Sequence, residues 1–151
     1  MASLCLRFTK NESDAVEVLN NGFLKVFRNI QRYETAQASL YTWIRTIIIN
    51  SCIDFIKTKQ KEERHLELSD DIVVHIPAEI IGKIKAGELL ELIRQLTPAT
   101  MAVFNLYVIE GYNHREIGGL LGITEGTSKW HLSEARKNLQ QMIKVQDLAN
   151  L

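Results

Sequence analysis

The chain has 151 residues, of which 46% are hydrophobic and 24% are charged. These proportions indicate a folded globular protein and exclude a disordered, collagen-like or low-complexity chain. Basic and acidic side chains number 18 each, so no net charge draws the whole chain toward nucleic acid or a membrane surface.

Cysteine content and hydropathy together predict a cytoplasmic protein. Cys5 and Cys52 are too few for a disulfide framework, which favours a reducing compartment. The apolar run 43–56 contains Arg45, Asn50 and Asp54, so it is too polar to span a bilayer. The first eight residues lack the apolar stretch and cleavage site of a signal peptide.

The charges are distributed unevenly along the chain. Residues 1–62 carry nine basic and six acidic side chains, whereas residues 63–96 carry four and seven. The acidic stretch has poor apolar periodicity and contains Pro77. We therefore expect two small helical domains, at 1–65 and 83–151, joined by an acidic linker over 66–82.

The first domain begins with two clear helix signals. Asn11 is a good N-cap for an acidic first turn, and apolar residues recur with helical spacing from Ala15 to Ile30. Ser39 can cap a second, longer helix that ends near Lys61. No window alternates with the period of a strand. The expected fold class is all-α.

The longer helix carries a polar stripe that could hold single-stranded DNA. At about 100° per residue, six of its residues fall on one line: Trp43, Thr46, Asn50, Asp54, Lys57 and Lys61. Aromatic rings can stack on unpaired bases while lysines hold phosphates. The polar loop 33–39 and Tyr41 adjoin this stripe. A tryptophan such as Trp43 is, however, more often a core residue than a stacking platform.

The second domain contains a helix-turn-helix pattern. Thr97 and Pro98 mark a helix start, and Gly111 is a plausible left-handed end for that helix. Asn113 and Glu116 fit a capping box for the next helix. Gly122 then breaks this helix, Thr124 can cap the following one, and a helix from residue 125 to about 143 completes the motif.

The last helix has the side chains expected of a DNA-recognition helix. Thr127, Ser128, Lys129 and His131 lie in its first two turns, the part of such a helix that enters the major groove. His131 could add positive charge when protonated. The competing interpretation is an ordinary helical hairpin with a solvated basic face.

The sequence shows no sign of catalysis. It contains no glycine-rich phosphate loop, nucleophile elbow or paired-carboxylate arrangement. The four histidines are too widely spaced for a local metal motif. We therefore expect no enzyme activity, no cofactor and no metal.

Several runs together resemble a bacterial RNA polymerase sigma factor of the extracytoplasmic-function (ECF) type. The run 22–27 is similar to the family's polymerase-binding helix, and Trp43-Ile44-Arg45 with Asn50 and Asp54 resembles its promoter-melting helix. In the second half, Glu110-Gly111-Tyr112, 121–123 and 126–129 resemble its reader of the upstream promoter element. The resemblance covers about 4–145 and lacks the start of region 2, the first helix of the promoter-melting domain.

The resemblance implies a transcription initiation factor that binds core RNA polymerase and directs it to promoter DNA, in some members under control of an anti-sigma factor. It implies that core polymerase contacts Asp14, Glu17, Asn20, Asn21 and Lys25. It implies that the downstream element and the melted strand contact Tyr33, Glu34, Gln37, Ser39, Tyr41, Trp43, Arg45, Asn50, Lys57 and Lys61. It implies that the upstream element is read by Thr124, Thr127, Ser128, Lys129, Trp130, His131, Ser133 and Arg136.

Two other functions remain open at this point. A stand-alone helix-turn-helix regulator would use 97–145 but leave the polar stripe of 43–61 without a role. A helical adaptor or decoy would bind polymerase or an anti-sigma protein without productive DNA contact. Trp130, His131 and Glu134 stand where family members more often have small or basic residues, which favours weaker phosphate attraction.

Overall fold

The computed structural model describes residues 1–63 and 86–149, and every regular element within these ranges is helical. The all-α prediction is therefore confirmed. We call residues 1–63 the N-terminal unit and residues 86–149 the C-terminal unit. The linker expected over 66–82 lies outside the described residues.

The N-terminal unit consists of α1 (Ala2–Phe8), α2 (Glu12–Asn29), the 3₁₀ turn η1 (Ile30–Arg32) and α3 (Leu40–Glu63). The predicted cap of α2 is confirmed, because the side chain of Asn11 accepts a hydrogen bond of 2.8 Å from the backbone N–H of Asp14. Gly22 of α2 lies against α3, and a Cβ atom there would come within 2.4 Å of the Ile48 side chain. Small size at this position lets α2 and α3 pack closely.

The C-terminal unit consists of α4 (Ala86–Arg94), α5 (Pro98–Phe104), the π-helical turn η3 (Asn105–Ile109), α6 (His114–Leu121) and α7 (Glu125–Ala149). The predicted capping box is present, with Asn113 and Glu116 each bonding to the backbone of the other. Gly122 ends α6 with a φ of +71°, a conformation in which a side chain would be strained. These features confirm the helix-turn-helix prediction.

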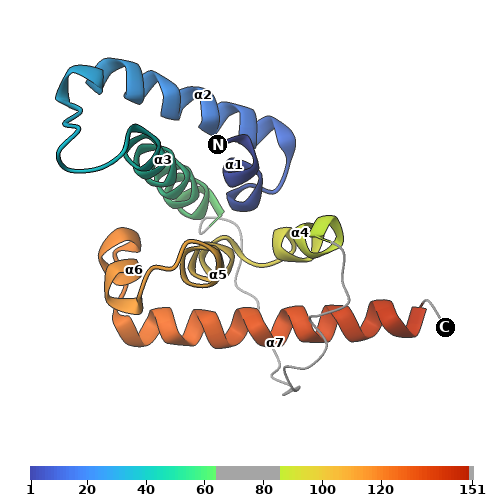
Figure 1. The fold of residues 1–151 in the computed structure, drawn as a ribbon. Helices are drawn as coiled ribbons and strands as arrows, with labels where there is room; N and C mark the ends of the chain where they lie inside the picture. Colours follow the sequence, from blue (N-terminus) through green and yellow to red (C-terminus); the bar gives the residue numbers. More distant parts are fainter. Residues whose placement is uncertain (64–85, 150–151) are drawn as a thin grey trace.

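The two units pack directly on one another (Figure 1). In the ribbon view α3 lies across α5 with α6 beside it, and α7 runs along the opposite side of the C-terminal unit. One continuous hydrophobic cluster contains side chains from both units, including Phe8, Ile49, Met101 and Leu106. The thiols of Cys5 and Cys52 are fully buried in it. This packing brings the two predicted DNA-contacting helices into one body.

Candidate nucleic-acid interface

The first turns of α7 form an exposed polar surface. Thr124 fixes the start of the helix, because its hydroxyl accepts a hydrogen bond of 3.1 Å from the backbone N–H of Thr127. Lys129 is exposed and pairs at 2.8 Å with Glu125, and this hydrogen bond lowers the pKa of that carboxyl group. Other exposed residues of this surface are Trp130, Ser133 and Arg136. They are the side chains that a DNA duplex could reach.

Two of the predicted reading residues point inward instead. Ser128 is fully buried, and its hydroxyl lies 2.9 Å from Nδ1 of His114. Its spacing from Leu132 and Ala135 places it on the buried face of α7, a periodicity that the sequence already contained. Ser128 therefore fixes α7 against α6 in this structure, which corrects its assignment to the exposed reading surface.

His131 is half-buried, with Nδ1 at 3.0 Å from the hydroxyl of Thr100 on α5. Burial lowers the pKa of His131 below its ordinary value, and the nearby Glu134 only partly offsets this effect. Burial therefore disfavours the positive charge that His131 could add when protonated. Its ring instead forms part of the contact between α5 and α7.

The polar stripe of α3 is exposed along most of its length, at Thr46, Asn50, Asp54, Lys57 and Lys61. Trp43, at its start, is half-buried, and its ring centroid lies 5.4 Å from that of Tyr33. Asp54 does not stand as an isolated negative charge in the stripe, because Lys25 of α2 pairs with it at 2.8 Å.

Internal hydrogen bonds define the shape of the loop before α3. The hydroxyl of Tyr33 donates to the carbonyl oxygen of Ala38 at 3.0 Å, and the side chain of Gln37 donates to Glu34 at 2.6 Å. Ser39 caps α3, since its hydroxyl accepts from the backbone N–H of Thr42 at 3.1 Å. Tyr41 is exposed just beyond this cap. The loop is thus preformed next to the aromatic end of the stripe.

Arg45 is held differently from the rest of the predicted melting residues. Its guanidinium forms an ion pair with Glu110 of the C-terminal unit. Arg7 of α1 pairs with the same carboxylate at 2.7 Å. No local sequence pattern indicates the role of Glu110, because its partners lie far away along the chain.

The residues expected to bind polymerase lie on α2, and three of them, Glu17, Asn21 and Lys25, face the groove beside α3. Glu17, Asn20 and Asn21 are exposed, whereas Asp14 is half-buried beside Asn11. The same helix exposes three large apolar side chains that were not among the predicted contacts, Val16, Leu24 and Phe27, and Ile30 is exposed at the start of η1. Apolar side chains exposed along one helix are typical of a protein-binding surface.

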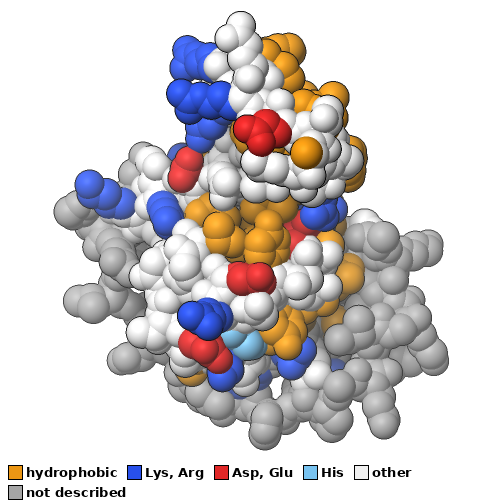
Figure 2. Space-filling view, turned by 60° about the vertical axis from the view of Figure 1, so that its left-hand side comes forward, with side chains coloured by type: hydrophobic (Ala, Val, Ile, Leu, Met, Phe, Trp, Pro, Cys, Tyr) orange, Lys and Arg blue, Asp and Glu red, His pale blue; other side chains and the backbone are white. Residues whose placement is uncertain are grey.

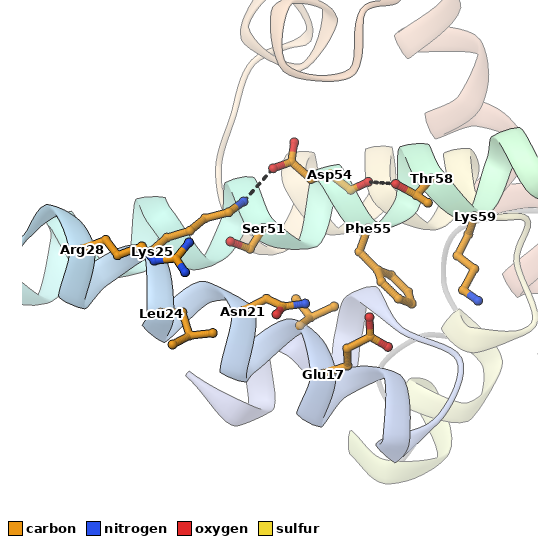
Figure 3. A pocket seen from close by; sticks show the side chains of 11 residues that line it. Glu17, Asn21, Leu24, Lys25, Arg28, Ser51, Asp54, Phe55, Thr58 and Lys59 are labelled. Carbon is orange, nitrogen blue, oxygen red and sulfur yellow. Dashed lines mark hydrogen bonds and ion pairs between the residues drawn. The ribbon is translucent and has the colours of Figure 1, made fainter.

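A groove of about 380 Å³, lined by both polar and apolar side chains, runs along one side of the contact between α2 and α3 (Figure 3). Glu17, Asn21 and Arg28 line it from α2, and Phe55 and Thr58 line it from α3. The Lys25–Asp54 ion pair bridges the two helices at this groove. The groove therefore connects the expected polymerase-binding face of α2 with the polar stripe of α3.

The surface on which α3 begins and α6 lies is chemically mixed (Figure 2). Lysine and arginine side chains gather near the top of this view, and hydrophobic side chains fill the hollow between the upper and lower parts. Over the described residues, no group of three or more metal-ligating side chains is found. None of the described helices combines the length and apolar character needed to cross a membrane.

Comparison with known proteins adds independent information. The family model for sigma-70 region 2 matches residues 1–62, and that for sigma-70 region 4 matches residues 86–139. The ECF RNA polymerase sigma factor SigE of Mycolicibacterium smegmatis is 26% identical over 147 residues, covering 93% of this chain. The RNA polymerase sigma factor CarQ of Myxococcus xanthus is 25% identical over 138 residues, covering 91% of this chain and 79% of its own length. The chain spans only 56% of the length of SigE.

A solved structure shares the fold. The sigma factor RpoE of Bartonella quintana, in complex with the anti-sigma factor NepR, matches with a TM-score of 0.62 and 19% identity. The match covers 95% of this chain and 89% of that one. At this level of identity the likeness concerns the fold alone.

Proposed function

The chain belongs to the sigma-70 family of transcription initiation factors, in its ECF type, and from this premise we propose that it directs core RNA polymerase to specific promoters and helps to open them. Members of this family bind core polymerase and promoter DNA, and they are not catalysts themselves. The observation that carries the proposal is that matches to both region 2 and region 4 lie in one chain. A stand-alone regulator or an adaptor would not require both.

We assign the upstream promoter element to α7. Its exposed reading residues are Thr124, Thr127, Lys129, Trp130, Ser133 and Arg136. The N-terminus of a helix attracts phosphate, and Lys129 and Arg136 add positive charge beside it. Thr127 and Ser133 can bond base edges or phosphates, and Trp130 offers an apolar face to a thymine methyl group. Ser128 and His131 support this surface from inside.

We assign the downstream element and the melted strand to the loop before α3 and to the stripe along α3. The loop contributes Tyr33, Glu34, Gln37 and Ser39, and α3 contributes Tyr41, Trp43, Arg45, Asn50, Lys57 and Lys61. Aromatic side chains at one end of the stripe and lysines at the other suit stacked bases and backbone phosphates, respectively. The hydrogen-bonded loop lowers the entropy cost of capturing an unstacked base.

We assign core polymerase to α2 and to the groove beside it, where polar contacts come from Asp14, Glu17, Asn20, Asn21 and Lys25. The exposed apolar side chains, of which Phe27 is 70% exposed, supply the hydrophobic area that a stable interface needs. The structure that shares this fold was solved with an anti-sigma factor. We accordingly include an anti-sigma factor among the possible partners of this chain.

The proposal extends to domain organisation and location. The N-terminal domain is 1–65, the linker 66–82 and the C-terminal domain 83–151, a division supported by the two family matches on either side of residues 63–85. The chain acts in the cytoplasm, where core RNA polymerase works, and it has no enzyme activity or cofactor of its own.

The direct test is run-off transcription from a mixed promoter library, with core RNA polymerase present or absent. We expect template-specific transcripts that require both this protein and core polymerase. Transcripts that appear with core polymerase alone, or none with both while the protein binds core polymerase, would contradict the proposal. In the second case the protein would be an adaptor.

A further inference from the structure

Glu110 joins the two units of the protein through a buried ionic contact. It lies just after η3, and its side chain has no exposed surface. Arg7 of α1 and Arg45 of α3 both pair with its carboxylate. Both arginines belong to the N-terminal unit, whereas Glu110 belongs to the C-terminal unit. A carboxylate that is removed from water in this way is stabilised in the fold only while its cationic partners stay in place.

Further contacts surround this ion pair. The side chain of Asn105 donates a hydrogen bond of 2.6 Å to the backbone oxygen of Arg7. A cleft of about 240 Å³ beside Glu110 is lined by Thr42, Thr46 and Ile49 of α3 on one side, and by Gly111, Tyr112 and Glu116 on the other. Burial and the charge of Glu110 raise the pKa of Tyr112. The wall opposite α3 carries two carboxyl groups, those of Glu110 and Glu116.

This acidic wall faces the part of α3 that we assign to DNA. Thr46 belongs to the polar stripe, and Arg45 is one turn before Ile49 on the same helix. A phosphate that approached Arg45 would meet a carboxylate already bonded to that arginine, and Glu116 would repel it. The anionic oxygens of Glu110 hold the guanidinium as a DNA phosphate would.

We infer that the closed packing of the two units is a self-inhibited state, in which Glu110 occupies Arg45 in place of a DNA phosphate. The inference rests on the proposed function, because it takes α3 to be a DNA-binding helix. Opening the contact frees Arg45 and removes the acidic wall from beside Thr46, and the two units can then separate to reach different promoter elements. Closure thus restrains DNA binding until the units are parted.

The shape of the full chain in solution tests closure without any DNA or polymerase. We compare the wild type with Glu110→Gln, and with Glu91→Gln as a control that removes one exposed carboxylate of the C-terminal unit away from the contact. Small-angle X-ray scattering of the closed chain should give a radius of gyration of about 15 Å. We expect Glu91→Gln to match the wild type and Glu110→Gln to give a clearly larger value. Equal values for all three overturn the inference.

Binding of a fluorescent single-stranded oligonucleotide tests the inhibitory role. If closed molecules outnumber open ones by roughly nine to one, opening the contact with Glu110→Gln should make the protein bind the oligonucleotide roughly tenfold more tightly than Glu91→Gln does. The two variants have the same net charge. An expanded Glu110→Gln that binds no better than the control overturns the competition between Glu110 and phosphate. Failure of all variants to bind DNA, with the expansion intact, contradicts the assignment of α3 to DNA and with it the inhibitory role, but leaves the closed contact itself established.

A second variant covers the case in which Glu110→Gln fails to fold, as judged by its circular dichroism. Arg7→Gln removes one arm of the contact from a residue to which we assign no DNA or polymerase contact. It should shift the radius of gyration and the oligonucleotide affinity in the same direction, by smaller amounts. A folded Arg7→Gln with wild-type shape and affinity overturns the inference.

Discussion

Gly118 lies against the backbone of Ile123, so that a Cβ atom at position 118 would come within 2.8 Å of the Ile123 carbonyl oxygen. The same turn is closed by hydrogen bonds of 2.9 and 3.1 Å from the N–H groups of Gly122 and Ile123 to the oxygen of Gly118. The close approach is made by backbone atoms, which cannot rotate away as a flexible side chain could. The angle between the two helices of the DNA-reading motif therefore depends on glycine at this position.

Gly118→Ala should lower the free energy of unfolding by about 1–3 kcal/mol through overpacking. Gly119 provides the matched control, because a Cβ atom there meets nothing within 4 Å. Gly119→Ala should raise stability by up to about 1 kcal/mol, since alanine favours the helix. Urea unfolding of both variants checks this pair, and equal shifts for the two would contradict the steric argument.

The contact between His131 and Thr100 should make stability depend on pH. Burial lowers the pKa of His131 in the folded protein, whereas the same imidazole has an ordinary pKa near 6.5 in the unfolded chain. When the pH falls to that range, the unfolded chain therefore binds more protons than the folded chain. The free energy of unfolding should therefore decrease as the pH falls from 7.5 to 5.5. The slope should be smaller in His131→Gln, measured by urea unfolding at both pH values. Identical slopes would argue that the pKa of His131 is the same in the folded and the unfolded chain.

Lys129→Ala should weaken binding to duplex DNA carrying the upstream element. Loss of one phosphate contact should also make the plot of log K, the DNA association constant, against log salt concentration less steep by about 0.9. The exposed pair with Glu125 contributes little to folding, so the variant should keep its stability. Lys144→Ala, near the other end of α7, is the control and should bind like the wild type. Fluorescence anisotropy at several salt concentrations measures both, and equal behaviour of the two variants would remove Lys129 from the interface.

Asn50→Ala should spare duplex binding and impair promoter opening, because Asn50 is exposed in the middle of the α3 stripe. Permanganate footprinting of the complex with core polymerase detects the unpaired thymines directly. Thr58→Ala, which changes an exposed polar residue of the same helix outside the stripe, is the control. Unchanged melting in Asn50→Ala would exclude the residue from the single-strand contact.

Phe27→Ser should reduce affinity for core RNA polymerase, because the Phe27 ring is 70% exposed on α2 and is available as an interface anchor. A loss of about 2 kcal/mol is typical of such an anchor and corresponds to an affinity about thirtyfold weaker. Val145→Ser removes another exposed apolar side chain, at the far end of α7, and should have no effect. Co-purification and titration with core polymerase provide the readout, and parallel losses in both variants would indicate a nonspecific effect.

The features that sequence alone predicted are those set by neighbouring residues. Asn11, the Asn113–Glu116 box and Gly122 fix helix ends through bonds that span only a few positions, so the pattern of residues was sufficient to locate them. The exposure of the α3 stripe followed from helical periodicity in the same way. A local signal needs no knowledge of the rest of the fold.

The features that sequence did not predict depend on packing between distant segments. Nothing near Glu110 indicates that Arg7 and Arg45 will meet it, and nothing near Asp54 indicates Lys25. The half-burial of His131 likewise comes from α5, which places Thr100 beside the ring. The inward orientation of Ser128 is different, because its spacing from Leu132 already indicated the buried face of α7. The prediction of a DNA contact instead followed the frequent use of hydroxyl side chains in DNA binding.

The burial of Cys5 and Cys52 has a practical consequence for following the two units in motion. These are the only cysteines of the chain, and neither thiol has surface exposed to reagents in the folded state. A cysteine introduced on each unit can therefore be coupled to maleimide dyes under native conditions while the natural thiols stay unmodified. Distance changes between the dyes can then be recorded on single molecules in an otherwise unaltered chain.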